Sequence, residues 1–254
     1  HYALERDEFL FHYQPKLNLE TGRIQGVEAL IRWNHPGKGL LSPAVFLELL
    51  EESGGIVKVG RTLLRSACFQ TASWHAAGFV DLDVAVNISG KEFWHGNLVT
   101  DVREALEQSG LPPHSLHLEL TEGIFMQDVE AAVSLILALK ALGVAVAIDD
   151  FGTGYSSLAH LKRFPLDILK IDRYFVKDIP HAPINEALIG SILALCRGLK
   201  LGTVAEGVEN REQLDVLRKL GCQIVQGYFI SRPVPADEIA ALLDRDWLRE
   251  FDQV

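Results

Sequence analysis

The chain has 254 residues, of which 48% are hydrophobic and 23% are charged, and its formal net charge is −10. This composition is that of an ordinary globular protein, and the length allows one barrel-sized domain or two small domains around a large core. The negative charge argues against a general nucleic-acid binder, which needs a basic face to neutralise phosphates. A small anionic substrate stays possible, because a bound metal ion reverses the local field.

Apolar runs, the start of the chain and the cysteines indicate the cellular location and the parent protein. No apolar run reaches the roughly 20 residues that a membrane helix needs, and no signal peptide is visible. The chain opens on His1 and runs directly into a helix-like segment, so we interpret residues 1–254 as a single domain excised from a longer protein. Cys68, Cys196 and Cys222 are odd in number and lack CxxC spacing, which favours reduced thiols and a cytoplasmic location.

Short apolar runs alternate with helical segments along the chain. Several runs are rich in Val, Ile and Leu without strict alternation, which is typical of strands covered on both faces. The predicted strands are Leu10–Leu17, Ile24–Trp33, Leu82–Ile88, Ser115–Leu120, Ala145–Asp149, Ile168–Ile171, Thr203–Ala205 and Ile224–Phe229. The predicted helices are Pro43–Ser53, Val57–Ala77, Asn97–Gln108, Asp128–Leu142, Tyr155–Lys162, Ile184–Leu199, Arg211–Leu220 and Ala236–Leu243.

This alternation predicts a parallel sheet, and the number of units in a chain of this length predicts that the sheet closes into a barrel. One connection departs from the pattern. Only Leu17–Gly22 separates the first two strands, and its LETG residues favour a turn over a crossover helix. We therefore predict an α/β fold, a modified TIM-type (β/α)8 barrel whose first strand is antiparallel.

Polar residues gather at the C-terminal ends of the predicted strands, where the catalytic groups of a barrel lie. Burying a carboxylate without a partner is costly, yet Glu119 stands between two leucines. An internal salt-bridge network is one explanation, but Arg32 and Lys170 are the clear cations nearby. A hard divalent cation accounts better for the excess negative charge, and oxygen donors suit Mg²⁺ or Mn²⁺ better than zinc. The strand-end residues are Glu28, Asn87, Glu119, Glu122, Asp149, Asp150, Lys170, Asp172, Glu206, Glu209 and Gln226.

The adjacent residues Asp149 and Asp150 favour two ions. If the strand ends there, both side chains can turn towards the mouth, and two metals about 4 Å apart would stabilise the attacking and leaving oxygens of a displacement at phosphorus. The segment continues as DDFGTGYSS, in which Gly152 and Gly154 permit unusual backbone angles. Alone this segment is equally well a plain turn, but next to paired aspartates it reads as a loop that shapes the metal site.

An ordered series of motifs covers nearly the whole chain. It comprises Tyr13-Gln14-Pro15, Glu28-Ala29-Leu30, Asn87-Ile88-Ser89, Glu119-Leu120-Thr121-Glu122, Asp149 to Leu158, Leu169-Lys170-Ile171-Asp172, Ala205-Glu206-Gly207-Val208-Glu209 and Gln226-Gly227-Tyr228, with Pro233 beyond. In this series the chain resembles the EAL domain family of cyclic di-GMP phosphodiesterases. Tyr174 and Asn210 depart from the usual family residues, and neither is a proposed ligand.

The resemblance implies a role for each site residue. Glu28, Asn87, Glu119 and Asp149 would hold a first metal, and Asp149 and Asp150 a second. Glu206 would lie near the nucleophilic water as a base or as a ligand through water, and Lys170 would orient that water, so Glu206, Lys170 and Glu28 are the implied catalytic residues. Gln14 and Arg32 would contact substrate, with Gln226 and Glu209 lining the site. Glu122 would anchor the loop that contains Gly152 and Gly154 and couple it to a dimer interface.

The implied reaction is hydrolysis of one phosphodiester of cyclic di-GMP to linear pGpG, which lowers the level of a bacterial second messenger. It would use two Mg²⁺ or Mn²⁺ ions and be inhibited by Ca²⁺. The implied partners are a second copy of the chain and GGDEF, sensory or membrane domains of a longer protein, without DNA or RNA. A membrane anchor in that longer protein is compatible with the resemblance. Two alternatives stay open: a catalytically inactive cyclic di-GMP receptor, and a barrel enzyme that acts on another phosphate ester.

Overall fold

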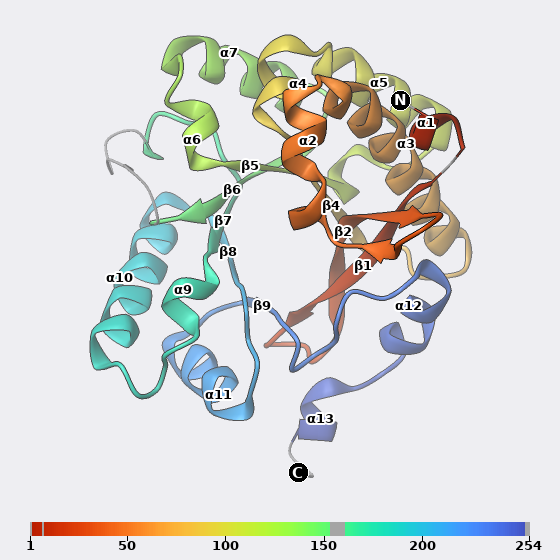
Figure 1. The fold of residues 1–254 in the computed structure, drawn as a ribbon. Helices are drawn as coiled ribbons and strands as arrows, with labels where there is room; N and C mark the ends of the chain where they lie inside the picture. The colour runs from red at the N-terminus through yellow and green to blue at the C-terminus, as the bar shows by residue number, and fades with distance from the viewer. Residues whose placement is uncertain (1, 7, 153–160, 252–254) are drawn as a thin grey trace.

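A closed barrel of eight strands, wrapped by helices, forms the molecule in our computed structural model, which describes residues 2–6, 8–152 and 161–251 (Figure 1). Most of the helix predicted at Tyr155–Lys162, together with Gly154, lies outside these residues. The barrel strands are β1 (Phe9–Asn18), β2 (Ile24–His35), β4 (Asp83–Asn87), β5 (Leu116–Thr121), β6 (Ala145–Phe151), β7 (Ile168–Ile171), β8 (Gly202–Ala205) and β9 (Ile224–Gln226). The predicted barrel is therefore confirmed.

The first strand runs against both of its neighbours. β1 pairs antiparallel with β2 and with β9, whereas β2, β4 and the later barrel strands pair in parallel. In this register Gln14 faces Glu28, and Lys16 faces Gln226. The predicted antiparallel hairpin is thus confirmed, and it closes the barrel between β2 and β9.

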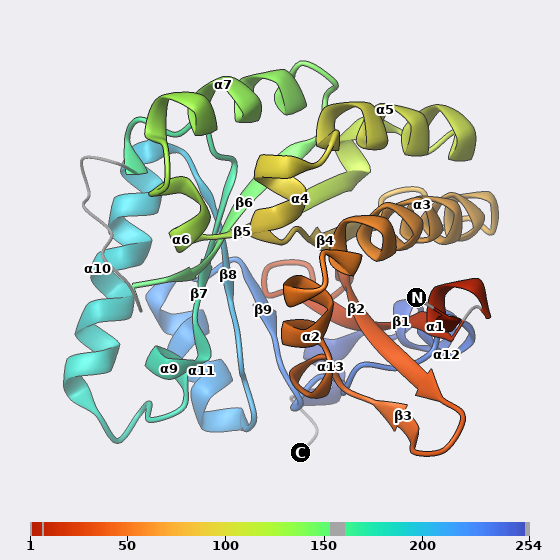
Figure 2. The ribbon, with the colours of Figure 1, turned by 45° about the horizontal axis from the view of Figure 1, so that its top comes forward.

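Helices cover the outside of the barrel (Figures 1 and 2). Their ends follow local capping chemistry: Asp128 and Asn210 accept hydrogen bonds from the first turns that they precede, and Gly110 and Gly221 end helices in the left-handed conformation. The helices are α1 (Tyr2–Glu5), α2 (Leu47–Glu52), α3 (Gly55–Ala76), α4 (Gly90–His95), α5 (Leu98–Ser109), α6 (Glu122–Phe125), α7 (Val129–Lys140), α9 (Arg173–Val176), α10 (Pro183–Leu199), α11 (Arg211–Leu220), α12 (Ala236–Leu243) and α13 (Trp247–Phe251), with 3-10 turns at Pro43–Val45 and Pro113–Ser115.

Some predicted boundaries were wrong. The helix expected at Pro43–Ser53 breaks at Phe46, whose φ is −136° and whose buried ring packs 5.7 Å from the rings of Phe9 and Trp33. The last strand ends at Gln226 rather than Phe229, because the chain turns at Gly227 against the backbone of Val208. The short strand β3 (Gly39–Leu41), which pairs with the outer end of β2, was not predicted.

The strand period explains how charges come to lie inside the barrel. In β5, Leu118 and Leu120 are fully buried beneath the surrounding helices, so Glu119 between them points to the barrel interior. Lys170 alternates in the same way with Leu169 and Ile171 in β7. The three cysteines are buried and unpaired with one another, as predicted. None of the described helices combines the length and the apolar character needed to cross a bilayer.

Candidate active site at the barrel mouth

Lys170 lies at the centre of the charged residues in the barrel mouth. Its Nζ atom lies 2.5 Å from Oε2 of Glu119, 2.7 Å from Oε1 of Glu206, 2.9 Å from Oδ2 of Asp149 and 3.7 Å from Oε2 of Glu28. Burial alone would lower the pKa of Lys170, but these carboxylates raise it well above its ordinary value. The ammonium therefore keeps its charge, and it holds together three strand carboxylates and Glu206, which follows β8.

Two amides fix the carboxylate of Glu28. Nδ2 of Asn87 donates to its Oε1, and Nε2 of Gln226 donates to its Oε2, both at 2.6 Å. The same Gln226 nitrogen donates to Oε1 of Gln14 at 2.9 Å. The position of β1 between β2 and β9 makes this chain of contacts possible. Four residues that the sequence assigned to one site thus lie in direct contact.

Glu119 is clamped between two lysines. Lys16 lies 2.8 Å from its Oε1, and Lys170 lies 2.5 Å from its Oε2. Burial would raise the pKa of Glu119, but the charges and hydrogen bonds of the two lysines lower it to about 2. Sequence reasoning missed Lys16. The signal was present, because Lys16 stands two residues after Gln14 in a strand and so shares its face.

Glu206 follows β8 directly and contacts Lys170. Burial raises its pKa, Lys170 partly offsets that effect, and the carboxylates of Asp149 and Glu28 reinforce it, so that the pKa is about 8. A carboxylate with a raised pKa binds a proton more readily near neutral pH than an ordinary glutamate does. In the metal-free site Glu206 is therefore partly protonated at neutral pH, and it acts as a base only in its ionised form.

The paired aspartates lie near the end of β6, at an irregularity. The pairing with β7 shifts register between Ile148 and Phe151, and Asp150 has a φ of 55°, in the left-handed region. Asp149 turns inward to Lys170, while Asp150 is exposed and donates its backbone N–H to Oδ1 of Asp149 at 2.8 Å. The pKa of Asp150 is raised, mainly by partial burial and to a smaller extent by the nearby carboxylates of Asp149 and Asp172. The irregularity lets two consecutive carboxylates stay at the mouth.

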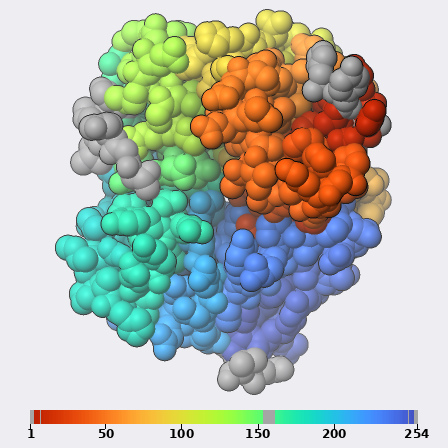
Figure 3. Space-filling model, in the orientation of Figure 1, coloured from red at the N-terminus to blue at the C-terminus, as the bar shows by residue number. Residues whose placement is uncertain are grey.

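A cavity of about 210 Å³ opens over these residues, on the face where Figure 3 shows a hollow between segments coloured orange, cyan and blue. Arg173 and Tyr228 line it, and neither was predicted as a site residue. Tyr228 is 52% exposed, and the Arg232 guanidinium lies 4.3 Å from its ring centroid. The lining residues are Gln14, Glu28, Leu30, Asp149, Lys170, Arg173, Glu206, Gly207, Glu209, Gln226, Gly227 and Tyr228.

Three predicted residues lie at the edges of this group. Arg32 is partly buried in β2 and donates to the Ile31 carbonyl at 2.8 Å; burial lowers its pKa, while Tyr228 and Glu28 favour its charged form. Glu209 is exposed but lines the cavity. Glu122 is buried at the start of α6, and both of its carboxylate oxygens lack a hydrogen-bond partner among the described residues.

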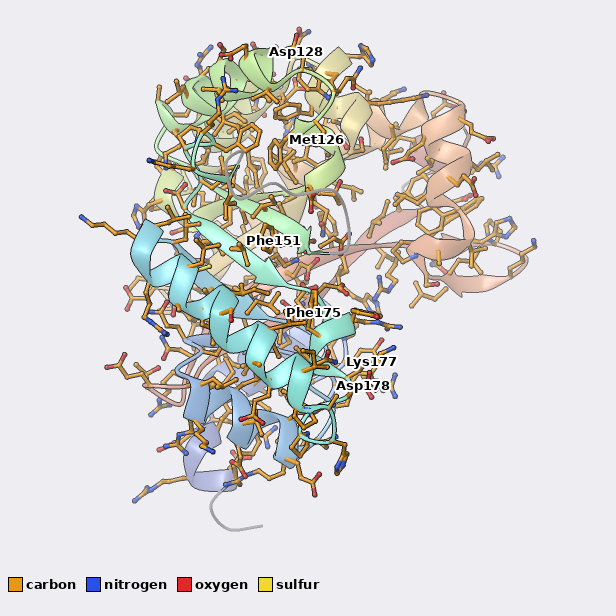
Figure 4. All side chains as sticks on the ribbon, turned by 90° about the vertical axis from the view of Figure 1, so that its left-hand side faces the viewer. Met126, Asp128, Phe151, Phe175, Lys177 and Asp178 are labelled. Carbon is orange, nitrogen blue, oxygen red and sulfur yellow. The ribbon has the colours of Figure 1, made fainter. Side chains whose placement is uncertain are left out.

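Gly152 is the described glycine of the predicted loop. Its φ is 93°, and a Cβ there would lie 2.9 Å from the ring of Phe175 on α9. Figure 4 labels Phe151, at the end of β6, and Phe175, on α9. The position therefore requires glycine both for its backbone angle and for space. The coupling role assigned to Glu122, Gly152 and Gly154 stays a prediction.

The donor groups fit a hard divalent cation. They are carboxylate and amide oxygens, and the carboxylates already converge on one positive charge, that of Lys170. As the described side chains stand, no group of three Asp, Glu, His or Cys residues is arranged to hold an ion. The ammonium of Lys170 lies between them. Metal binding therefore requires a shift of side chains at the mouth, chiefly that of Lys170.

Comparisons with known proteins agree with this geometry. MucR of Pseudomonas aeruginosa, a bifunctional diguanylate cyclase/cyclic di-GMP phosphodiesterase, is 46% identical over 239 residues, which make up 94% of this chain and 35% of MucR. The cyclic di-GMP phosphodiesterase NbdA of the same organism is 45% identical over 249 residues, 98% of this chain and 31% of NbdA. The solved PaMucR phosphodiesterase in complex with c-di-GMP has a TM-score of 0.90 at 46% identity and covers 93% of this chain and 96% of its own.

The chain spans about a third of the length of the curated relatives that it matches, at 36%, 35% and 31% for the first three. The family model described as EAL domain matches residues 1–233. This match includes every residue assigned above to the barrel mouth. The chain therefore belongs to the EAL domain family.

Proposed function

We propose that this chain is a phosphodiesterase that hydrolyses cyclic di-GMP to linear pGpG with the help of divalent metal. The observation that carries the proposal is the convergence of Glu28, Glu119, Asp149 and Glu206 on one point at the mouth of an EAL-domain barrel. Divalent-metal dependence is general among EAL-domain phosphodiesterases. The use of two Mg²⁺ or Mn²⁺ ions is part of the proposal.

The proposed ligands of the first ion are Glu28, Asn87, Glu119 and Asp149, and those of the second are Asp149 and Asp150. When bound, the ions supply an activated water and stabilise negative charge at phosphorus. Asn87 and Gln226 orient Glu28 by hydrogen bonds at 2.6 Å, so this ligand is fixed before an ion arrives. Oxygen ligands of this kind suit Mg²⁺ and Mn²⁺.

Two side chains of the protein handle the proton of the attacking water and the negative charge that develops at phosphorus. Glu206 accepts the proton of the attacking water, which its raised pKa favours. Lys170, 2.7 Å from Oε1 of Glu206, orients that water and stabilises the charge that develops on the phosphoryl oxygens. The water attacks phosphorus, the bond from phosphorus to the 3′ oxygen breaks, and this oxygen takes up a proton from solvent to leave as the ribose hydroxyl.

The proposed substrate contacts surround the same cavity. Gln14, Gln226 and Glu209 line it, and Arg32 lies on the β2 face that carries Glu28, where its guanidinium would pair with a phosphate. A cyclic dinucleotide is small and carries two negative charges. The metal ions and Arg32 offset these charges, so the net charge of −10 is no obstacle.

The direct test is incubation of the purified chain with cyclic di-GMP and Mg²⁺, with pGpG followed by chromatography. We expect product from the wild type and none from Glu28→Ala or Asp149→Asn, each of which removes a proposed ligand. Glu48→Gln, an exposed change on α2, is the matched control and should leave turnover unchanged. Full activity in either ligand variant would overturn the metal assignment. Tight cyclic di-GMP binding without product in the wild type would identify the chain as a receptor.

The remaining expectations concern the protein around the site. A homodimer, coupling of the site to a dimer interface through Glu122, attached GGDEF, sensory or membrane domains and a cytoplasmic location stay predictions. The relatives are consistent with attached domains, since the chain covers only 35% of MucR and 31% of NbdA.

A further inference from the structure

Lys16 is a buried cation that the proposed reaction does not use. Because β1 alternates its faces, Lys16 points into the barrel on the same side as Gln14, and it faces Gln226 across the β1–β9 pair. Its side chain is 7% exposed. The described residues that line the cavity do not include Lys16. Lys16 therefore lies beneath the site, without access to a substrate in the cavity.

The contact of Lys16 is with a single proposed metal ligand. Its Nζ lies 2.8 Å from Oε1 of Glu119, while Nζ of Lys170 lies 2.5 Å from Oε2. Each carboxylate oxygen thus has its own ammonium, and the two contacts together fix the plane of the carboxylate. A charged hydrogen bond in a buried site holds its partner's orientation more strongly than one in water.

We propose that Lys16 is a positioning residue that locks Oε1 of Glu119, so that Oε2 is the oxygen that reaches an ion at the mouth once Lys170 gives up its contact. This inference rests on the metal-dependent function proposed above. Lys170 must shift when metal binds, because it lies among the same carboxylates, whereas Lys16 lies away from the cavity and can keep its contact. Lys16 then holds Glu119 in one orientation with and without the ion.

Because Lys16 is charged, a positioning role and a purely structural role predict different effects of removing it. Lys16 and Lys170 are the two ammonium groups that contact Glu119 among the described residues. Removing Lys16 makes the mouth more negative, which favours a divalent cation, but it frees Glu119 to turn. We therefore expect the loss of Lys16 to disorder the orientation of Glu119 while leaving the affinity for a divalent cation unchanged or higher. General damage to the barrel would instead lower turnover and cation affinity together.

The test compares Lys16→Met with the wild type. We expect kcat to fall by about 10- to 100-fold, the range for lost outer-shell partners of metal ligands, while KM for cyclic di-GMP changes by less than about two-fold. Mn²⁺ binding to the metal-free protein, measured by calorimetry, should be no weaker than in the wild type. Lys140→Met is the matched control, since it breaks a lysine–aspartate pair with Asp167 far from the mouth, and its kcat should be unchanged.

Two results would overturn the proposal: a kcat of Lys16→Met within about two-fold of the wild type, or a parallel loss of kcat and Mn²⁺ binding. If Lys16→Met does not fold, Lys16→Gln is measured in the same way; it keeps a hydrogen-bond donor but loses the charge, and an intermediate kcat is expected. A wild-type kcat in Lys16→Gln would also count against the proposal.

Wild-type turnover is measured first, because its absence contradicts the proposed function and not the role of Lys16. In that case a crystal structure of the Mn²⁺-loaded protein decides the inference. We expect Glu119 to offer one oxygen to the ion in the wild type, and to turn or offer both oxygens in Lys16→Met. An identical Glu119 carboxylate in the two structures would refute the positioning role.

Discussion

Nζ of Lys170 lies 2.5 Å from Oε2 of Glu119, and both side chains are only 1% exposed. This pair is buried without access to water, so its attraction has to offset the cost of removing two charges from solvent. Contacts with Asp149 and Glu206 add to that attraction. The Lys170 ammonium therefore stabilises the metal-free barrel and also takes part in the proposed reaction.

Replacement of Lys170 should expose both roles. In Lys170→Met we expect turnover to fall at least about 100-fold, because a charge-stabilising group is lost. Without metal the free energy of unfolding should drop by about 3–5 kcal/mol, since buried carboxylates lose their common partner. Urea denaturation with and without Mg²⁺ checks this, and Mg²⁺ should stabilise the variant more than the wild type. Equal unfolding midpoints of the two metal-free proteins would contradict it.

Gly227 should tolerate no side chain. A Cβ there would lie 2.1 Å from the carbonyl oxygen of Val208 and 2.3 Å from its nitrogen, so Gly227→Ala must push the end of β9 away from the segment after Glu206. We expect a loss of at least about 2 kcal/mol in stability, as for other overpacked sites, and a marked loss of turnover. Gly198→Ala in α10 is the control, because nothing lies within 4 Å of its Cβ position. Thermal unfolding measures the stability and the pGpG assay measures the turnover. Wild-type values for Gly227→Ala would show that the backbones at positions 227 and 208 can move apart without cost.

Glu92 should make stability depend on pH. Its carboxylate packs on Gly60 and accepts hydrogen bonds from the Ser89 hydroxyl at 2.6 Å and backbone N–H at 2.9 Å. Burial raises its pKa from 4.5 to about 7, although these bonds oppose the shift. The folded protein therefore binds this proton more tightly than the unfolded chain. Its stabilising contribution is complete below pH 4.5 and is lost as pH rises to about 7.

Glu92→Gln removes this titration. We expect the variant to gain stability relative to the wild type as pH rises from 4.5 to 7, by at most about 3 kcal/mol. Chemical denaturation across this range gives the difference directly. Glu48→Gln, at an exposed position, should track the wild type at every pH. A difference that is constant with pH would show that Glu92 is ionised in the same way in both states.

The choice of metal should control turnover. Chelation with EDTA should abolish pGpG formation, and Mg²⁺ or Mn²⁺ should restore it. Ca²⁺ should bind but give at least about 10-fold less product, because its longer bonds and looser coordination misplace the attacking water. Competition of Ca²⁺ against a fixed Mg²⁺ concentration checks that both occupy one site. Equal turnover with Ca²⁺ would contradict the geometric argument.

Sequence patterns predicted the barrel, its antiparallel first strand and most of the mouth, because strand periodicity and position within a barrel determine where Glu28, Glu119 and Asp149 point. They did not predict Lys16 as the partner of Glu119, since that pairing joins residues 103 positions apart across the barrel interior. They also missed the break at Phe46, where packing on Phe9 and Trp33 interrupts the helical segment that begins after Ser42. Tertiary contact, not local preference, decides such positions.

The reversal of β1 changes which side of the barrel the start of the chain reaches. In a barrel of parallel strands only, the first strand starts at the face opposite the active site. Here Phe9 pairs with Trp33 at the outer end of β2, so the first residues of β1 lie at the catalytic rim. A pull or twist applied to the chain before Phe9 would travel along the β1 backbone directly to Gln14, without crossing a helix. The hairpin thus connects the amino-terminal segment to the mouth through β1 alone.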